Sequence, residues 1–346
     1  MAVSSWSSSI TSSLASFLPS SATDAATATL AWFTGTPPTP PPPPIDTSAR
    51  VELVMSLILL AQLALLLLIF QFLTPVKGGV GRWLPPPETD KGAYERFVLT
   101  YTPVWIGVFA VIIAGQLYES FTANTYMLVC AGLCVPLFLY AVLAPSLPPH
   151  VPPSDALAGS SSFFERYPFK ASVWLAIYSH IGNYWYTHYF YAVLKASYSM
   201  PSFRLNDVPL PLYFATFFYF STYHILSNVL LRRVCTGYAP NIFRSIFLVC
   251  LVVVLSYFTA FTETLTISSF PYYSFEDPFM AMTVGSAFYG IYFLVSFPAF
   301  FRLDEWEGAR LSLYQTGMDS LGAGMLILIL LDAVRLCLAI PLTIKG

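Results

Sequence analysis

Charged residues are scarce in this chain, and their scarcity sets the first limit on its structure. Asp, Glu, Lys and Arg make up 10% of the 346 residues, whereas an ordinary soluble domain has about 25%. The net charge of −2 offers no basic face for nucleic acid. Most of the chain therefore cannot face water, and we expect no nucleic-acid partner.

Motifs for metal, nucleotide and hydrolase chemistry are also missing. The five cysteines lack CxxC pairs and metal-ligand spacing, which excludes a disulfide framework or zinc site, and we interpret them as packing residues. The sequence contains no Gly-rich phosphate loop, GxSxG elbow or HExxH pair. We therefore expect no metal and no cofactor.

The first 49 residues contain no Lys or Arg and end in a proline run. A secretory signal peptide needs a basic start and a mitochondrial presequence needs arginines. The Ser-, Ala-, Thr- and Pro-rich composition predicts a disordered tail over residues 1–50. An organelle transit peptide has a similar composition and stays open as an alternative.

Long hydrophobic runs dominate the rest of the chain, in which 56% of all residues are hydrophobic. A membrane-spanning helix needs about 20 mainly apolar residues, because lipid cannot pair with backbone polar groups. Eight segments qualify: 53–73, 98–118, 124–144, 172–194, 211–231, 242–265, 280–301 and 318–341. They predict an all-α, polytopic membrane bundle. We divide it into an extra hydrophobic segment with its loop, 51–97, and a membrane domain, 98–346.

The distribution of Lys and Arg predicts the orientation of the bundle. Cytoplasmic loops of membrane proteins carry an excess of these residues. If the loop at 74–97 is cytoplasmic, most Lys and Arg fall on that side. Both termini are then lumenal, provided that all eight spans are real.

Polar residues inside the segment 172–194 form the first candidate site. Residues three or four apart share one face of an α-helix. This spacing predicts a continuous polar face, formed by His180, Asn183, Tyr184, Thr187, His188 and Tyr191. Interhelical hydrogen bonds, worth about 1 kcal/mol each, are the structural alternative. The number of polar groups favours a site.

Ionisable groups in other spans are functional candidates because their burial in a membrane is costly. Glu263 lies in a stretch without another charge, and burial favours the neutral carboxyl group, which can donate a proton. Glu119 ends the segment 98–118 and is equally consistent with an interfacial residue. His224 and Asn228 share a second polar face. Asp332 and Arg335, three residues apart, predict a structural ion pair.

Aromatic residues make up 17% of the chain and gather in the clusters YWYTHYFY, FPYY and FYGIYF. An interfacial belt explains some aromatic residues in a membrane protein, but these clusters are denser than a belt requires. Flat aromatic rings can hold a sterol skeleton and stabilise a cation above their faces.

Several long blocks carry a resemblance to a known family. They are RYPFKASVW (166–174), GNYWYTHYF (182–190), ASYSMPSFRLNDVP (196–209), YHILSNVLLRR (223–233), SYFTAFTETL (256–265), FPYYSFED (270–277) and FYGIYFLVSFPAFFRLDE (288–305). With fainter matches, the similarity extends from about residue 93 to about residue 336. In these blocks the chain resembles the cycloeucalenol cycloisomerase family.

The resemblance implies an intramembrane isomerase of sterol biosynthesis that opens the 9β,19-cyclopropane ring of a cyclopropyl sterol, converting cycloeucalenol to obtusifoliol. The reaction adds a proton at C19, forms a cation at C9 and removes the proton at C8. The implied partners are the sterol and membrane lipid, with no protein partner indicated, and the implied location is the endoplasmic reticulum. A non-catalytic sterol-binding or transport protein and a Δ8–Δ7-type sterol isomerase remain alternatives.

The matching positions supply the candidate site residues. The catalytic candidates are Glu263, His188, Glu119 and His224, and the substrate-binding candidates are Asn183, Tyr184, Thr187, Tyr189, Asn228, Tyr257, Tyr272, Tyr273 and Tyr289. We predict a coupled pair in which Glu263 donates the proton and His188 accepts or orients. His180 departs from the family pattern, which weakens its claim to a catalytic role.

Overall fold

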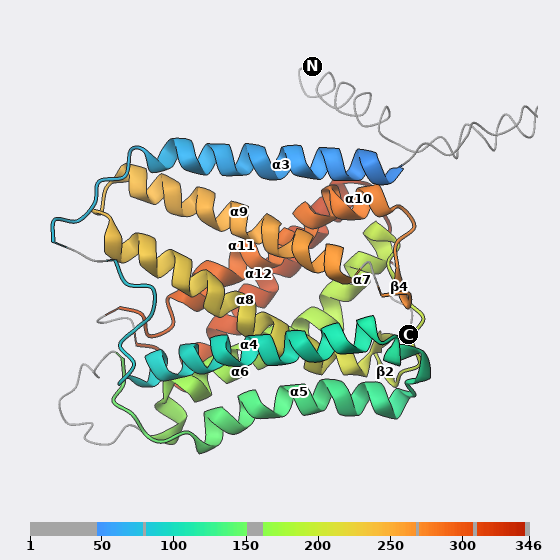
Figure 1. Ribbon diagram of the computed structural model, residues 1–346, viewed down its shortest axis with the longest axis horizontal. Helices are drawn as coiled ribbons and strands as arrows, with labels where there is room; N and C mark the ends of the chain where they lie inside the picture. Colours follow the sequence, from blue (N-terminus) through green and yellow to red (C-terminus); the bar gives the residue numbers. More distant parts are fainter. Residues whose placement is uncertain (1–46, 79–80, 151–161, 268–269, 307–309, 343–346) are drawn as a thin grey trace, which may run out of the picture. The chain divides into compact units, whose positions relative to one another are not determined.

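Long helices make up most of the described chain (Figure 1). The computed structural model describes residues 47–78, 81–150, 162–267, 270–306 and 310–342. From Ser48 onward the chain belongs to one compact unit. The predicted disordered tail lies outside the described residues except at its last few positions, and the domain division stays a prediction.

Each of the eight predicted spans corresponds to helical structure. Seven are regular helices: α3 (Thr47–Phe70), α4 (Asp90–Ala114), α5 (Ala123–Leu143), α8 (Leu210–Gly237), α9 (Ile242–Ile267), α11 (Val284–Phe301) and α12 (Leu313–Cys337). The eighth is the composite segment described below. Within the described residues, six helices are long and apolar enough to cross a membrane: α3, α4, α5, α9, α12 and α11 with its preceding turn. The predicted polytopic helical membrane bundle is confirmed.

Local sequence signals explain where several helices begin. Thr89 caps α4 by accepting a hydrogen bond from the Gly92 backbone N–H. Ser312 and Gln315 form a reciprocal capping box at the start of α12. Pro211 stands in the first turn of α8, where its missing N–H costs nothing.

Short elements close the two ends of the bundle. They are η1 (Leu117–Ser120), η2 (Phe163–Glu165), α10 (Pro278–Met282), β1 (Ser197–Tyr198), β2 (Arg204–Leu205), β3 (Val208–Pro209) and β4 (Tyr273–Ser274). Strand β1 pairs antiparallel with β4, and Tyr198 stands opposite Tyr273. Strand β2 pairs with β3. The β1–β4 pair ties the segment after residue 194 to the segment after α9.

The segment around 172–194 departs from a regular α-helix. It consists of α6 (Tyr167–Ile181), the π-helical turn η3 (Gly182–Tyr186), the single turn α7 (Thr187–Tyr189) and a second π-helical turn, η4 (Phe190–Leu194). A π-turn places more residues in each turn, so the six predicted residues do not all share one face. The continuous polar face predicted from α-helical spacing is therefore wrong: Asn183 is buried, whereas His180 is exposed.

The π-helical segment lies close against α12. The Tyr186 hydroxyl donates a hydrogen bond to the Gly324 carbonyl at 3.0 Å. A Cβ atom at Gly324 would come within 2.9 Å of the terminal Cδ1 atom of Ile181, so a larger residue here would require the Ile181 side chain to shift.

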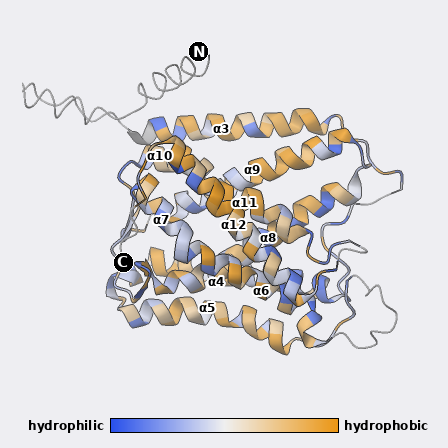
Figure 2. Cartoon of the chain, turned by 180° about the vertical axis from the view of Figure 1, so that it is seen from behind, coloured by the Kyte–Doolittle hydropathy of each residue, from blue (hydrophilic) through white to orange (hydrophobic). Residues whose placement is uncertain are grey.

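Apolar side chains face outward as well as inward. Figure 2 shows hydrophobic residues along most of α3 and α5, and α3 exposes large apolar side chains such as Leu53, Leu60 and Leu68. The outer helices thus present the apolar surface that a bilayer requires. The interior is rich in aromatic rings, including the fully buried Trp174 and Phe293.

A network of buried charges lies at the end of the bundle where α4 begins and α8 ends. Arg232 contacts Glu95 at 2.8 Å and Glu305 at 2.7 Å, and Lys91 contacts Glu305 at 2.8 Å. Lys170 forms a neighbouring buried ion pair with Asp304. We call Lys91, Glu95, Arg232 and Glu305 the ionic cluster. These residues lie outside the eight predicted spans, yet they are buried and paired.

Candidate functional site

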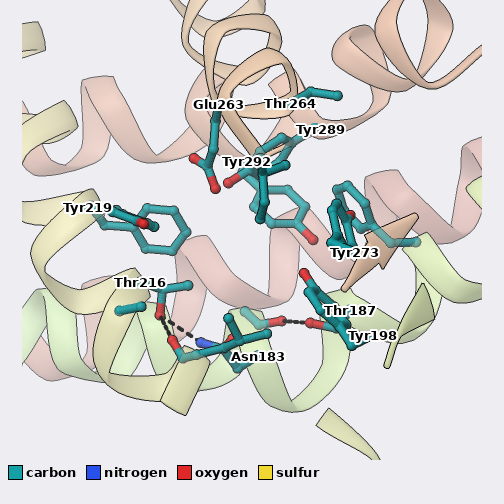
Figure 3. A pocket seen from close by; sticks show the side chains of 16 residues that line it. Asn183, Thr187, Tyr198, Thr216, Tyr219, Glu263, Thr264, Tyr273, Tyr289 and Tyr292 are labelled. Atoms are coloured by element: carbon teal, nitrogen blue, oxygen red, sulfur yellow. Dashed lines mark hydrogen bonds between the residues drawn. The ribbon is translucent and has the colours of Figure 1, made fainter. Parts of the chain in front are cut away.

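A cavity opens among the π-helical turns, α8, α9 and α11 (Figure 3). Its volume is about 80 Å³, below the roughly 300–1,000 Å³ found for small-molecule sites, so a larger ligand must displace some of the lining side chains. Its lining residues are Gly182, Asn183, Thr187, Phe190, Tyr198, Leu212, Ala215, Thr216, Tyr219, Phe220, Glu263, Thr264, Ile267, Tyr273, Tyr289 and Tyr292. We call it the Glu263 cavity.

Glu263 projects into this cavity from the last turns of α9 (Figure 3). The residue is surrounded by protein, yet its side chain keeps some accessible surface because it borders the cavity. Its Oε2 atom is buried and has no hydrogen-bond partner among the described residues. The hydroxyl groups of Tyr223 and Tyr289 interact with the carboxyl group. Among these lining residues, all within the described chain, Glu263 is the one carboxylic acid, and no Lys, Arg or His accompanies it.

Tyrosine rings form the walls around the carboxyl group. Tyr289 and Tyr292 meet edge to face with ring centroids 4.8 Å apart. Tyr198 and Tyr273 are stacked at 4.4 Å across the β1–β4 pair. In Figure 3, Tyr219 lies on one side of the cavity and the Tyr198–Tyr273 stack on the other. The walls therefore combine flat apolar faces with a few hydroxyl groups.

Polar side chains line the side of the cavity opposite Glu263 (Figure 3). The Asn183 amide donates hydrogen bonds to the Thr216 hydroxyl at 2.7 Å and to the Ser179 carbonyl at 2.8 Å. The Thr187 hydroxyl donates to the Gly182 carbonyl at 3.4 Å. The π-helical turns thus direct Asn183 and Thr187 toward the cavity.

Five of the predicted site residues therefore come together in one lining: Glu263, Asn183, Thr187, Tyr273 and Tyr289. They come from distant segments of the sequence. The structure assembles them through the packing of α9 on α11 and through the β1–β4 pair.

His188 lies outside this lining. It is buried and borders a second hollow with Tyr191, a residue with which it makes an edge-to-face ring contact. The structure thus gives Glu263 and His188, the predicted proton-transfer pair, different surroundings.

His224 and Asn228 have partners elsewhere in the bundle. Within a shell of aromatic rings, His224 Nδ1 donates a hydrogen bond to the Phe220 carbonyl at 2.7 Å, and His224 Nε2 shares a hydrogen bond with the Ser296 hydroxyl at 2.9 Å. Asn228 donates a hydrogen bond to Glu95 of the ionic cluster at 3.1 Å. Neither residue lines the Glu263 cavity.

The remaining candidates are spread over the described chain. Glu119 is exposed on η1, and Tyr272 contacts the edge of the Tyr118 ring. The Tyr257 hydroxyl donates to the Thr283 carbonyl. Asp332 forms an ion pair with Arg335 at 2.7 Å and accepts a hydrogen bond from Tyr189. Tyr184 stacks on the exposed His180.

Eleven lining residues were not among the sequence candidates, and five of them are polar: Tyr198, Thr216, Tyr219, Thr264 and Tyr292. Tyr292 is three residues from Tyr289, so helical spacing alone would have added it. Tyr198 had no such signal, because its place depends on the pairing of β1 with β4. Within the described residues, no cluster of three or more His, Cys, Asp or Glu side chains is arranged to hold a metal ion.

The fold and the cavity define a polytopic helical membrane protein with a tyrosine-walled cavity beside one carboxyl group. The chain is 40% identical to the cycloeucalenol cycloisomerase of Arabidopsis thaliana over 259 residues, which cover 74% of this chain and 89% of that protein. No family model and no solved structure matches. The chain belongs to the cycloeucalenol cycloisomerase family and is an isomerase of sterol biosynthesis. This confirms the resemblance found in the sequence.

Proposed function

We propose that this chain opens the 9β,19-cyclopropane ring of a cyclopropyl sterol, converting cycloeucalenol to obtusifoliol, with Glu263 as the acid. The observation that carries the proposal is the Glu263 carboxyl group, which has an unpartnered oxygen and faces a tyrosine-walled cavity. Without a nearby cation to stabilise a carboxylate, the neutral form costs less in this site. A neutral carboxyl group is the form that donates a proton.

The reaction requires a proton to enter and a proton to leave. Proton addition at C19 breaks the C9–C19 bond and places positive charge on C9. Loss of the proton from C8 then leaves its electron pair as the C8–C9 double bond. The sum of the two steps is an isomerisation that consumes no oxidant, reductant or co-reactant.

One carboxyl group can serve both steps. The C19 bridge and the C8 hydrogen lie on the same β face of the sterol, so the carboxylate left after donation faces the proton that must be removed. Glu263 is the one carboxylic acid among the described residues that line the cavity. We therefore propose that Glu263 donates at C19 and accepts from C8, in place of the Glu263–His188 pair expected from the sequence.

The tyrosine walls supply the second requirement of the mechanism. A cation at C9 is attracted to the faces of aromatic rings, with a gain of about 0.5–2 kcal/mol for each well-placed ring. Tyr219, Tyr289 and Tyr292 surround the carboxyl group and offer such faces. Aromatic faces stabilise the cation without forming a covalent bond to it. A nucleophilic side chain would form such a bond.

The charge distribution supports the proposed topology. The ionic cluster includes residues from the start of α4, and the strand β4, which contributes Tyr273 to the Glu263 cavity, lies at the opposite end of the bundle (Figure 1). We propose the cytoplasmic side for the ionic cluster, lumenal termini and location in the endoplasmic reticulum, since cytoplasmic ends collect Lys and Arg.

The deciding experiment offers the purified protein a cyclopropyl sterol and a Δ8 sterol and resolves the products by mass spectrometry. We expect ring opening of the cyclopropyl sterol and no shift of the Δ8 bond. Glu263→Gln should keep sterol binding and lose about 10²–10⁴-fold in kcat, the usual contribution of general acid catalysis.

Glu119→Gln is the matched control, because Glu119 is exposed on η1. This variant should keep wild-type turnover. Turnover of Glu263→Gln within a few-fold of wild type would remove Glu263 from the mechanism. Binding of sterol by the wild-type protein without any turnover would favour a transport protein instead.

A further inference from the structure

A second hollow lies beside the Glu263 cavity. Its volume is about 500 Å³, and it is bordered by His188, Tyr191, Lys195, Tyr198, Arg204 and Asp207 among others. We call it the His188 hollow. His188 is 2% exposed, and its Nε2 atom has no hydrogen-bond partner among the described residues. A buried polar atom without a partner costs about 1–3 kcal/mol unless a ligand or water satisfies it.

Tyr198 borders both spaces, so the His188 hollow and the Glu263 cavity adjoin at this one side chain. Its ring is held by the stack on Tyr273 and by an edge-to-face contact with Tyr191. Tyr198 is therefore the wall between the two spaces, and a rigid molecule that reaches from the Glu263 cavity into the hollow must displace this side chain.

Two of the three charged residues that border the His188 hollow, Arg204 and Asp207, pair with each other. Arg204 forms an ion pair with Asp207 at 3.4 Å and donates a hydrogen bond to the Tyr198 carbonyl. Lys195 is exposed to the surroundings. The buried group that lacks a partner is an imidazole nitrogen, not a charged side chain. This arrangement suits a neutral group that forms one hydrogen bond better than it suits an anion.

We propose that the His188 hollow holds the 3β-hydroxyl group of the sterol, with His188 Nε2 as its hydrogen-bond partner. This inference rests on the proposed function. Ring A alone separates C3, which carries the hydroxyl, from the cyclopropane ring. When the cyclopropane ring lies against Glu263, the hydroxyl group on ring A must lie beyond the aromatic walls of the cavity. The adjoining hollow with an unsatisfied imidazole provides that place.

His188 is then a binding and positioning residue for the sterol, not the proton acceptor. A hydrogen bond at one end of a rigid skeleton fixes where the reacting carbons lie at the other. A site built to bind a hydroxyl group rejects the analogue that lacks it, because the buried partner is left unpaired.

The test measures sterol binding in the Glu263→Gln protein, which does not depend on turnover. Equilibrium dissociation constants are compared for a 3β-hydroxy cyclopropyl sterol and its 3-deoxy analogue. We expect the hydroxy sterol to bind about 5–100-fold more tightly. In the double variant Glu263→Gln/His188→Ala, the two sterols should bind about equally tightly. In the double variant Glu263→Gln/His188→Gln, part of the preference for the hydroxy sterol should return.

His180→Ala is the matched control, because His180 is exposed and stacks on Tyr184 outside both linings. It should leave the preference unchanged. No preference in the Glu263→Gln protein, or a full preference after His188→Ala, would overturn the inference. In the active enzyme, a loss of 100-fold or more in kcat for His188→Ala on both sterols would overturn it too, since it would identify a proton-transfer role. An absence of ring opening in the wild type would instead refute the proposed function, and the binding ratio would still decide the role of His188.

Discussion

Removal of Arg232 is the sharpest test of the forces that hold this bundle together. Its guanidinium group makes two bidentate contacts with carboxylates: Nη1 and Nη2 donate to Glu95 at 2.8 and 2.9 Å, and Nε and Nη2 donate to Glu305 at 2.7 and 2.8 Å. In Arg232→Gln, Glu305 keeps Lys91 as a partner. Glu95 keeps only the amide of Asn228.

The size of the effect follows from this loss. A buried pair broken on one side costs about 3–5 kcal/mol, because the remaining charge stays buried without compensation. Glu95 is 0% exposed, so water cannot replace the lost contacts without opening the cluster. We therefore expect Arg232→Gln to reduce the free energy of unfolding by about 3–5 kcal/mol.

Denaturant-induced unfolding in detergent, followed by tryptophan fluorescence, measures this change. The double variant Arg232→Gln/Glu95→Gln removes the orphaned charge and should be more stable than Arg232→Gln alone. Lys77→Ala, at an exposed position, should stay within about 0.5 kcal/mol of wild type. A loss below 1 kcal/mol for Arg232→Gln, or a double variant less stable than the single one, would refute the reasoning about an uncompensated charge.

Two further predictions concern protons. Burial alone would raise the pKa of Glu305, but Lys91 and Arg232 outweigh burial and hold the pKa below its ordinary 4.5. A pKa that is lowered in the folded state stabilises the protein above pH 4.5. The unfolding temperature in detergent should therefore fall as the pH drops below about 4.5. Glu305→Gln should show a smaller fall, and an equal one would contradict this assignment. If Glu263 both donates and accepts, turnover of an 8-deuterated cyclopropyl sterol in H₂O should place part of the deuterium in the C19 methyl group of later product molecules. Complete loss of the label to solvent would contradict a single carboxyl group sheltered from water.

The sequence predicted the elements of the bundle well because the membrane imposes a simple rule on them. Each span must be long, apolar and helical, and this signal is local. Glu263 was found by the same rule, as a carboxyl group within an apolar stretch. The walls around it were harder to predict, since Tyr198 and Tyr219 reach the cavity only through the packing of separate segments.

The prediction of a continuous polar face at 172–194 was wrong because of the local helix geometry. The prediction assumed 3.6 residues per turn, but the π-helical turns at Gly182–Tyr186 and Phe190–Leu194 change the angle between successive side chains. Asn183 and Thr187 therefore line the Glu263 cavity, while His188 borders the neighbouring hollow. No local residue pattern predicted these π-helical turns. Close packing at Gly324 accompanies the first of them.

Buried carboxyl groups have opposite surroundings in the ionic cluster and in the Glu263 cavity, and the chemistry of each place explains the difference. In the ionic cluster, each carboxylate has a cation within 3 Å, which stabilises the charged form and holds the helices in register. In the Glu263 cavity, no cation is present among the lining residues of the described chain. A neighbouring guanidinium or ammonium group would stabilise the carboxylate, so the carboxyl group would already have lost the proton that it has to donate. A carboxyl group that must hold its proton until a cyclopropane binds is therefore kept apart from the cations that stabilise buried carboxylates elsewhere in the same bundle.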